Sequence, residues 1–250
     1  AVAGECLHAV FEHADFCDRG TWPGAVARAL ANHPPRSSST SDERTWPTML
    51  QGLLDDVLAT DLAPALAPQG LSVARLRLGE LPMHRRLTEM EFILPARDVD
   101  TTELAEVLRA AGHAVADLNA RSLDGYLRGF IDLVFEHDGR YHLLDWKSNH
   151  LGHRPQDYDD AALGRAMDDQ GYHLQYLLYT VALDRYLQQR QPGYQRQRHL
   201  GGVFYLFVRG VRPHWTQADG RPTGVFAARP AHALIERLSG LLGHADGGDR

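Results

Sequence analysis

The feature that most constrains the fold is a pair of apolar segments on either side of His137-Asp138-Gly139-Arg140. These segments are GFIDLVF, residues 129–135, and YHLLDWK, residues 141–147. An Asp-Gly pair between two such segments is among the best short-range signals for a tight β-hairpin. The sequence therefore predicts two antiparallel strands joined by a turn centred on Asp138 and Gly139.

This hairpin would bring three charged residues together. In such a hairpin, the numbers of two facing residues add up to the same total as the numbers of the two turn residues, which is 277. Asp132 and Asp145 also add up to 277, so they are expected to face each other. Side chains on facing residues point the same way, with Cβ atoms about 5 Å apart. Lys147 shares their face, because strand side chains repeat every second residue.

Two facing carboxylates repel each other and destabilise a hairpin unless a partner offsets the repulsion. Apolar neighbours such as Ile131, Leu143 and Trp146 predict strands buried on both faces, where charges are rare without a partner. A magnesium ion, which binds carboxylates, waters and phosphate oxygens, would remove the repulsion. The lysine could hold a water or help to deprotonate it. Burial would lower the pKa of its ammonium group and the carboxylates would raise it, and the sequence does not decide which effect is larger. The alternative is a solvated pair of aspartates on an exposed face.

Patterning elsewhere predicts a mixed sheet with helices packed on it. Strict alternation from Thr88 to Leu94 predicts a strand that stops before Pro95, and another strand is expected over Gly202–Val208. Helices are expected over residues 4–17, 48–58, 102–111, 161–188 and 231–242. The fold class is thus α/β.

Residues 1–250 are expected to form a single domain with a mobile, Ser-rich loop at about 33–45 and a disordered tail at about 244–250. No apolar run approaches the roughly 20 residues that cross a bilayer. The N-terminus shows no signal-peptide pattern and no initiator Met, which suggests a piece of a longer cytoplasmic protein. Cys6 and Cys17 are expected to be reduced thiols, and two cysteines are too few for an iron–sulfur or zinc site.

The net charge of −6 argues against a broad basic surface for nucleic acid. Binding of DNA would have to come from a local site, a bound metal or a larger assembly.

Asp132 with Asp145-x-Lys147 resembles the PD-(D/E)xK nucleases. The string GYLRGFIDLVFEHDGRYHLLDWKSNHLG is more specific, and it is similar to the C-terminal nuclease domains of RecB-type helicase–nucleases, the exonuclease V family. The similarity continues through HLQYLLYTVALDRYL and HLGGVFYLFVRGV, and reaches back to GECLHAVFE and EMEFILP. It implies a restriction-endonuclease-like mixed central sheet flanked by helices, and metal-dependent hydrolysis of DNA in end resection and recombinational double-strand break repair.

The resemblance also implies a metal site. Asp132 and Asp145 would bind the metal together with the main-chain carbonyl of Trp146, at a position where a tyrosine is common. His8 matches the histidine that completes the site. From the residues alone, His8 could equally form a local pair with Glu12 on one helix face.

Other implied roles lie outside the metal ligands. Lys147 would be the catalytic lysine. Glu89 matches an acidic position, but Glu91 lies on the same strand face and the residues alone do not choose between them. Gln175 and Tyr179 match a Q-x-x-x-Y motif, although helix packing explains Tyr179 equally well.

The implied cofactor is one or two Mg²⁺ ions, with Mn²⁺ or Ca²⁺ able to occupy the site. The implied partners are a DNA strand fed from a duplex end, the helicase portion of RecB, the RecC and RecD subunits, and RecA. A catalytically idle DNA-end-binding or docking module of the same fold is the alternative, and the intact set of Asp, Asp-x-Lys and His argues against it. The iron–sulfur branch of the superfamily requires four cysteines, and this chain has two.

Overall fold

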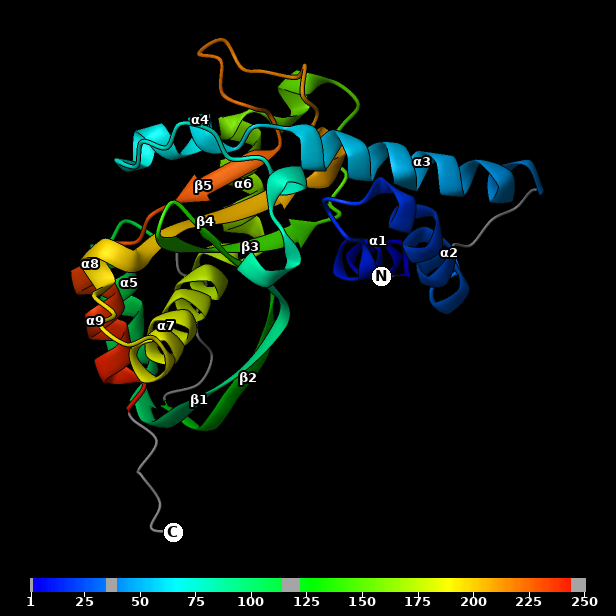
Figure 1. Cartoon of the computed structure of the whole chain (residues 1–250). Helices are drawn as coiled ribbons and strands as arrows, with labels where there is room; N and C mark the ends of the chain where they lie inside the picture. The colour runs from blue at the N-terminus through cyan, green and yellow to red at the C-terminus, as the bar shows by residue number, and fades with distance from the viewer. Residues whose placement is uncertain (1, 35–39, 114–121, 244–250) are drawn as a thin grey trace.

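Five strands form one mixed sheet in the order β1-β2-β3-β4-β5 (Figure 1). The computed structural model describes residues 2–34, 40–113 and 122–243. The strands are β1 Arg86–Asp100, β2 Ser122–His137, β3 Arg140–Lys147, β4 Leu200–Phe207 and β5 Val225–Ala228. The helices are α1 Val2–His13, α2 Trp22–Asn32, α3 Thr40–Ala59, α4 Ala63–Leu66, α5 Thr101–Ala110, α6 Asp160–Asp169, α7 Tyr172–Arg190, α8 Arg196–His199 and α9 His232–Leu241. This architecture confirms the predicted α/β class.

The hairpin between β2 and β3 has the predicted turn and register. Asp138 and Gly139 have φ angles of 53° and 73°, the positive values that a two-residue type I′ turn requires. The antiparallel pairs run from His137 with Arg140 to Leu133 with Leu144. The paired residues all sum to 277, as expected.

The sheet has a separate apolar core on each face. One core contains residues of α1 to α4 with Leu133, Leu144 and Trp146, and the other contains residues of α5, α6, α7 and α9 with Leu143 and Tyr205. Figure 1 shows α1 to α3 grouped at one end of the sheet, away from α7 and α9. Helices on both faces explain why the central strands are apolar almost throughout.

β3 and β4 are parallel, whereas the other neighbouring pairs are antiparallel. The chain crosses from one to the other through α6, α7 and α8. The carboxyl ends of β3 and β4 therefore meet at one edge of the sheet. In α/β sheets such an edge is the usual place for a ligand.

Several predicted element boundaries were wrong. β1 does not stop at Leu94 but continues through Pro95, because an edge strand does not need the N–H that proline lacks. The first helix ends at His13 rather than residue 17, where the Asp15 carboxylate accepts a hydrogen bond from the Cys17 N–H. The expected helix over 161–188 is two helices, because Gly171 adopts a left-handed φ of 65° between them.

The loop expected at about 33–45 is shorter than predicted, since α3 begins at Thr40. Residues 35–39 and the expected tail at 244–250 lie outside the described residues. No helix in the described ranges is long and apolar enough to span a membrane. Cys6 is buried and Cys17 is exposed, and both are free thiols as expected.

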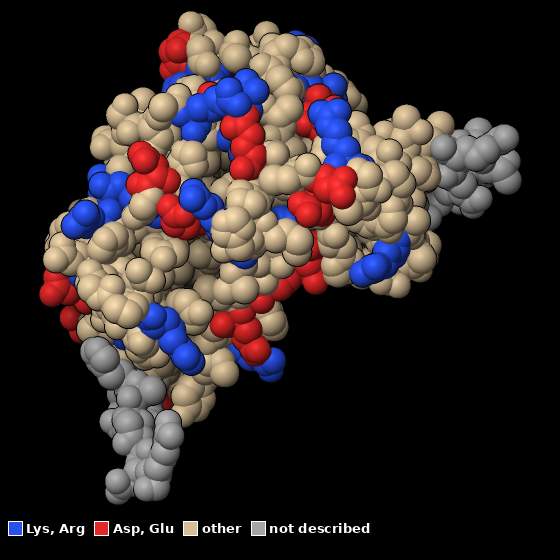
Figure 2. All heavy atoms as spheres, viewed as in Figure 1, with Lys and Arg blue, Asp and Glu red and all other residues tan. Residues whose placement is uncertain are grey.

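Charged side chains of both signs are interspersed over the face of the molecule in Figure 2. The view shows no continuous basic area. This distribution agrees with the net charge of −6.

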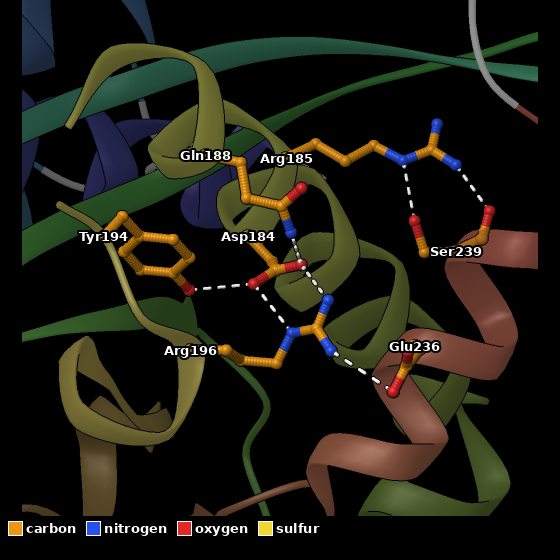
Figure 3. A network of polar contacts seen from close by, with 7 residues as sticks. All are labelled: Asp184, Arg185, Gln188, Tyr194, Arg196, Glu236 and Ser239. Atoms are coloured by element: carbon orange, nitrogen blue, oxygen red, sulfur yellow. Dashed lines mark hydrogen bonds and ion pairs between the residues drawn. The ribbon is translucent and has the colours of Figure 1, made fainter. Parts of the chain in front are cut away.

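A buried polar network ties α7 to the segments that follow it (Figure 3). The Asp184 carboxylate on α7 is fully buried, and it accepts two hydrogen bonds of 2.9 Å from the Arg196 guanidinium. Tyr194 and Gln188 donate two more, at 2.8 and 2.6 Å. The network fixes α8 against α7, the helix that carries Gln175 and Tyr179.

Candidate active site

The predicted site residues gather at the carboxyl end of β3. Beyond Leu144, β3 has no further paired residue on β2, and it continues beside β4, where Asp145 lies opposite Tyr205. α1 packs closely on the segment that follows β3, because a Cβ atom built at Gly4 would lie 2.9 Å from Ser148 Oγ. The site therefore lies between the sheet edge and α1.

Asp145 and Lys147 form a buried ion pair on the same face of β3, as the strand periodicity predicted. Lys147 Nζ lies 2.6 Å from Asp145 Oδ1, and the two side chains are only 9% and 4% exposed. The contact lacks hydrogen-bond alignment, so Asp145 Oδ1 has no hydrogen-bond donor within the described ranges. Asp145 Oδ1 is thus a buried carboxylate oxygen with an ion-pair partner but no aligned hydrogen-bond donor.

Asp132 reaches this pair through its side chain rather than through the strand ladder. Its Oδ2 atom accepts a hydrogen bond of 2.8 Å from the Trp146 N–H and lies 3.4 Å from His8 Nδ1. Burial and the negative charge of Asp132 raise the pKa of the Asp145 carboxyl, although Lys147 opposes the shift. The two carboxylates therefore act on each other electrostatically, although the paired part of the hairpin ends just before them, at Leu133 and Leu144.

His8 projects from α1 toward Asp132. Burial lowers the pKa of its imidazole, but the hydrogen bond with Asp132 and the charges of Asp132 and Asp145 outweigh burial and raise it. The nearest basic partner of Glu12 is His13, at 3.8 Å. His8 therefore belongs to the carboxylate cluster rather than to a pair with Glu12.

Glu89 lies in an irregular stretch of β1. The β1–β2 pairs pass from Thr88–Leu133 to Met90–Ile131, so Glu89 falls opposite Asp132 without a regular pair. Its φ is 51°, a left-handed value that is rare for a residue with a side chain. Burial and the charge of Asp132 raise the pKa of the Glu89 carboxyl.

The two glutamates of this strand have different surroundings. Glu91 forms an exposed ion pair with Arg128, at 2.5 Å. Glu89 responds electrostatically to Asp132, Asp145 and His8. The structure thus groups Glu89, and not Glu91, with the carboxylate cluster.

Gln175 connects Lys147 to two tyrosines. Its Oε1 atom accepts hydrogen bonds from Lys147 Nζ at 3.1 Å and from the Tyr205 hydroxyl at 3.0 Å. Its Nε2 atom donates to the Tyr179 hydroxyl at 2.7 Å. The ring of Tyr172 lies 3.8 Å from Lys147 Nζ, a cation–π contact.

Sequence reasoning missed Tyr172 and Tyr205. Tyr172 lies three residues before Gln175, so the helical spacing was a usable signal. Tyr205 reaches the site only through parallel pairing of β3 with β4, which no local pattern reveals.

The Trp146 side chain points away from the cluster. Its ring stacks on Phe11, with centroids 4.1 Å apart, inside the core that faces α1. Any contribution of Trp146 to the site must therefore come from its main chain, as the family resemblance implied.

Within the described ranges, no three His, Cys, Asp or Glu residues are arranged as a ready metal cluster. The buried carboxylate of Asp145 and the adjacent carboxylate of Asp132 nevertheless supply oxygen ligands of the kind that a hard divalent cation prefers. Magnesium keeps several waters and needs only one or two carboxylates. The residues present therefore fit such an ion.

Lys147 is the single lysine among the 26 Lys and Arg residues of the chain. Arginine stays protonated in proteins, whereas a lysine can release a proton when it is buried. The one lysine of the chain is thus buried within this cluster, beside Asp145.

Comparison with known proteins agrees with this geometry. A family model described as the PD-(D/E)XK nuclease superfamily matches residues 1–242. The RecBCD enzyme subunit RecB of Haemophilus influenzae is 36% identical over 96% of this chain and 18% of its own length. RecB of Escherichia coli is 35% identical over 97% of this chain and 19% of its own length. RecB of Mycobacterium tuberculosis is 39% identical over 74% of this chain and 20% of its own length. The chain thus spans about a fifth of these relatives.

Proposed function

Because the chain belongs to the PD-(D/E)XK nuclease superfamily, we propose that it hydrolyses phosphodiester bonds of DNA with a bound divalent metal ion. We also propose that it serves a RecB-like helicase–nuclease in end resection and recombinational double-strand break repair. The observation that carries the proposal is the buried Asp145–Lys147 pair beside the Asp132 carboxylate.

In this proposal Asp132 and Asp145 hold Mg²⁺, with His8 and the main-chain carbonyl of Trp146 as further ligands. The bound ion would polarise the phosphate and lower the pKa of a water. Glu89 adds negative charge to the cluster beside Asp132. These side chains come from α1, β1, β2 and β3, so the folded sheet is needed to assemble them.

Lys147 holds the attacking water and accepts or releases its proton at Nζ. Gln175 and Asp145 both contact that nitrogen, so they fix its position. Tyr179 in turn receives a hydrogen bond from the Gln175 amide, which orients the amide oxygen toward Lys147. This chain of contacts leaves the lysine few positions to adopt.

The wider assignments rest on the relatives named RecBCD enzyme subunit RecB. The proposed cofactor is one or two Mg²⁺ ions, which Mn²⁺ or Ca²⁺ can replace. The proposed substrate is a DNA strand fed from a duplex end by the helicase portion of RecB. RecC, RecD and RecA are the proposed protein partners, and the cytoplasm is the proposed location.

A cleavage assay on linear DNA tests the function. Wild-type chain should degrade the DNA in magnesium, and chelation should stop the reaction. Lys147→Ala and Asp145→Asn should each lower the rate by about 100-fold or more, the first through loss of acid–base chemistry and the second through loss of a metal ligand. Asp169→Asn, which removes a carboxylate exposed on α6, should cleave at the wild-type rate.

Lys147→Arg provides a second test, because it keeps the positive charge beside Asp145 but does not release a proton. It should fold normally by circular dichroism and remain inactive. Wild-type rates in both lysine variants would refute the assignment. Binding of DNA ends without cleavage in magnesium or manganese would favour the idle docking module.

A further inference from the structure

A groove of about 500 Å³ opens beside the carboxyl ends of β3 and β4. It is lined by α3, by the segment that follows β3 and by the segment that follows β4. Its polar lining consists of His150, His153, Arg209, Arg212 and Asp56. His150 lies three residues after Lys147, so the groove begins where the chain leaves the candidate active site.

Two arginines and one aspartate, Asp56, line this groove and leave it with a net positive charge. The Arg209 Nε atom donates a 3.0 Å hydrogen bond to the carbonyl oxygen of Ser148, the residue after Lys147. Neither Arg209 nor Arg212 forms an ion pair within the part of the chain that the structure describes. By contrast, Arg154 and Arg221 are each paired with an aspartate. In a chain of net charge −6, such a groove attracts anions locally.

The groove also offers flat surfaces. The Arg212 guanidinium stacks over the Trp215 ring at 4.5 Å, and its Nε atom is buried without an acceptor in the described ranges. The His150 and His153 rings lie 4.6 Å apart, and both side chains are exposed. Aromatic rings and guanidinium planes beside cations are what proteins use to stack unpaired bases and track a phosphate backbone.

We propose that this groove binds single-stranded DNA and leads it to the site of Asp145 and Lys147. Arg209 and Arg212 contact phosphates, and Trp215 with its stacked arginine supports a base. A duplex buries its base faces in its own stack, so these flat groups favour a single strand. The role of the groove as a path to cleavage rests on the proposed nuclease function, but binding of the strand does not.

Fluorescence anisotropy of a labelled oligothymidylate, measured with a chelator present, tests the proposal on the 250-residue chain. Replacing both Arg209 and Arg212 with Gln should weaken binding about tenfold and lower the slope of log K against log salt by about 1.4, since each phosphate contact contributes about 0.7 for single strands. Trp215→Ala should weaken binding about tenfold without changing that slope. Trp215→Phe should retain most of the affinity and guards against a folding defect.

Arg109→Gln is the control, because it makes the same Arg-to-Gln change once, at an exposed position on α5 away from the groove. Its affinity and salt slope should equal those of the wild-type chain. Equal weakening by Arg109→Gln and by the groove variants, no measurable binding by the wild type, or tighter binding of a duplex than of the single strand would each overturn the proposal. Because hydrolysis does not occur in chelator, these outcomes are separate from a failure to cleave in magnesium.

Discussion

Replacing Arg196 with Ala should destabilise the protein by about 3 kcal/mol, because it leaves Asp184 buried without its cation. Removing one partner of a buried ion pair typically costs about 3–5 kcal/mol. The lower end applies here because Tyr194 and Gln188 still donate to the carboxylate of Asp184. For a chain of this length, about 3 kcal/mol corresponds to a fall in Tm of about 6–12 °C.

Urea unfolding followed by tryptophan fluorescence measures this loss. The exposed pair of Arg237 with Glu103, at 3.9 Å, provides the control, and Arg237→Gln should be indistinguishable from the wild type. A double variant, Asp184→Leu with Arg196→Met, should recover most of the stability, because apolar side chains can replace a buried pair without a large loss. If Arg196→Ala were as stable as Arg237→Gln, the buried network would not stabilise the fold as argued.

Three further predictions follow from other residues. Burial lowers the pKa of His142 from 6.5 to about 3, so near pH 5 the unfolded chain binds a proton at this residue that the folded protein does not. The free energy of unfolding should therefore be at its full value above pH 6.5 and fall by about 2 kcal/mol between pH 8 and pH 5. Urea titrations of His142→Leu should lack that loss. Glu89→Gly should raise the free energy of unfolding by about 1 kcal/mol, because glycine tolerates the left-handed φ of 51°, and it should lower the rate of cleavage. Glu89→Ala keeps the backbone strain, so it should lower the rate of cleavage without the gain in stability. His8→Ala should lose cleavage in magnesium and partly recover it at higher metal concentration. If calorimetry gave equal affinities for Mn²⁺ in the wild type and the variant, His8 would not be a metal ligand.

The hairpin was predictable because its register depends on local chemistry. The turn residues Asp138 and Gly139 determine which residues face each other, and the burial of both strands follows from their apolar sequence. Asp132, Asp145 and Lys147 could therefore be grouped from the sequence alone.

What could not be predicted depends on long-range arrangement. Pro95 ends a strand only where its missing N–H would be needed, and a sequence does not show which strand lies at the sheet edge. The choice of Glu89 over Glu91 depends on a local left-handed backbone at Glu89, and alternation alone treats the two as equivalent. The four residues of β5 are too few to show a pattern.

Because the one lysine of the chain is buried at the end of β3, cleavage at that residue can report when the strand opens. A protease that cuts only after lysine has a single target in this chain, the bond between Lys147 and Ser148. Because the Lys147 side chain is only 9% exposed, that bond cannot be cut until the end of β3 leaves the sheet. The rate at which two fragments, residues 1–147 and 148–250, accumulate under native conditions would therefore report how often this strand opens.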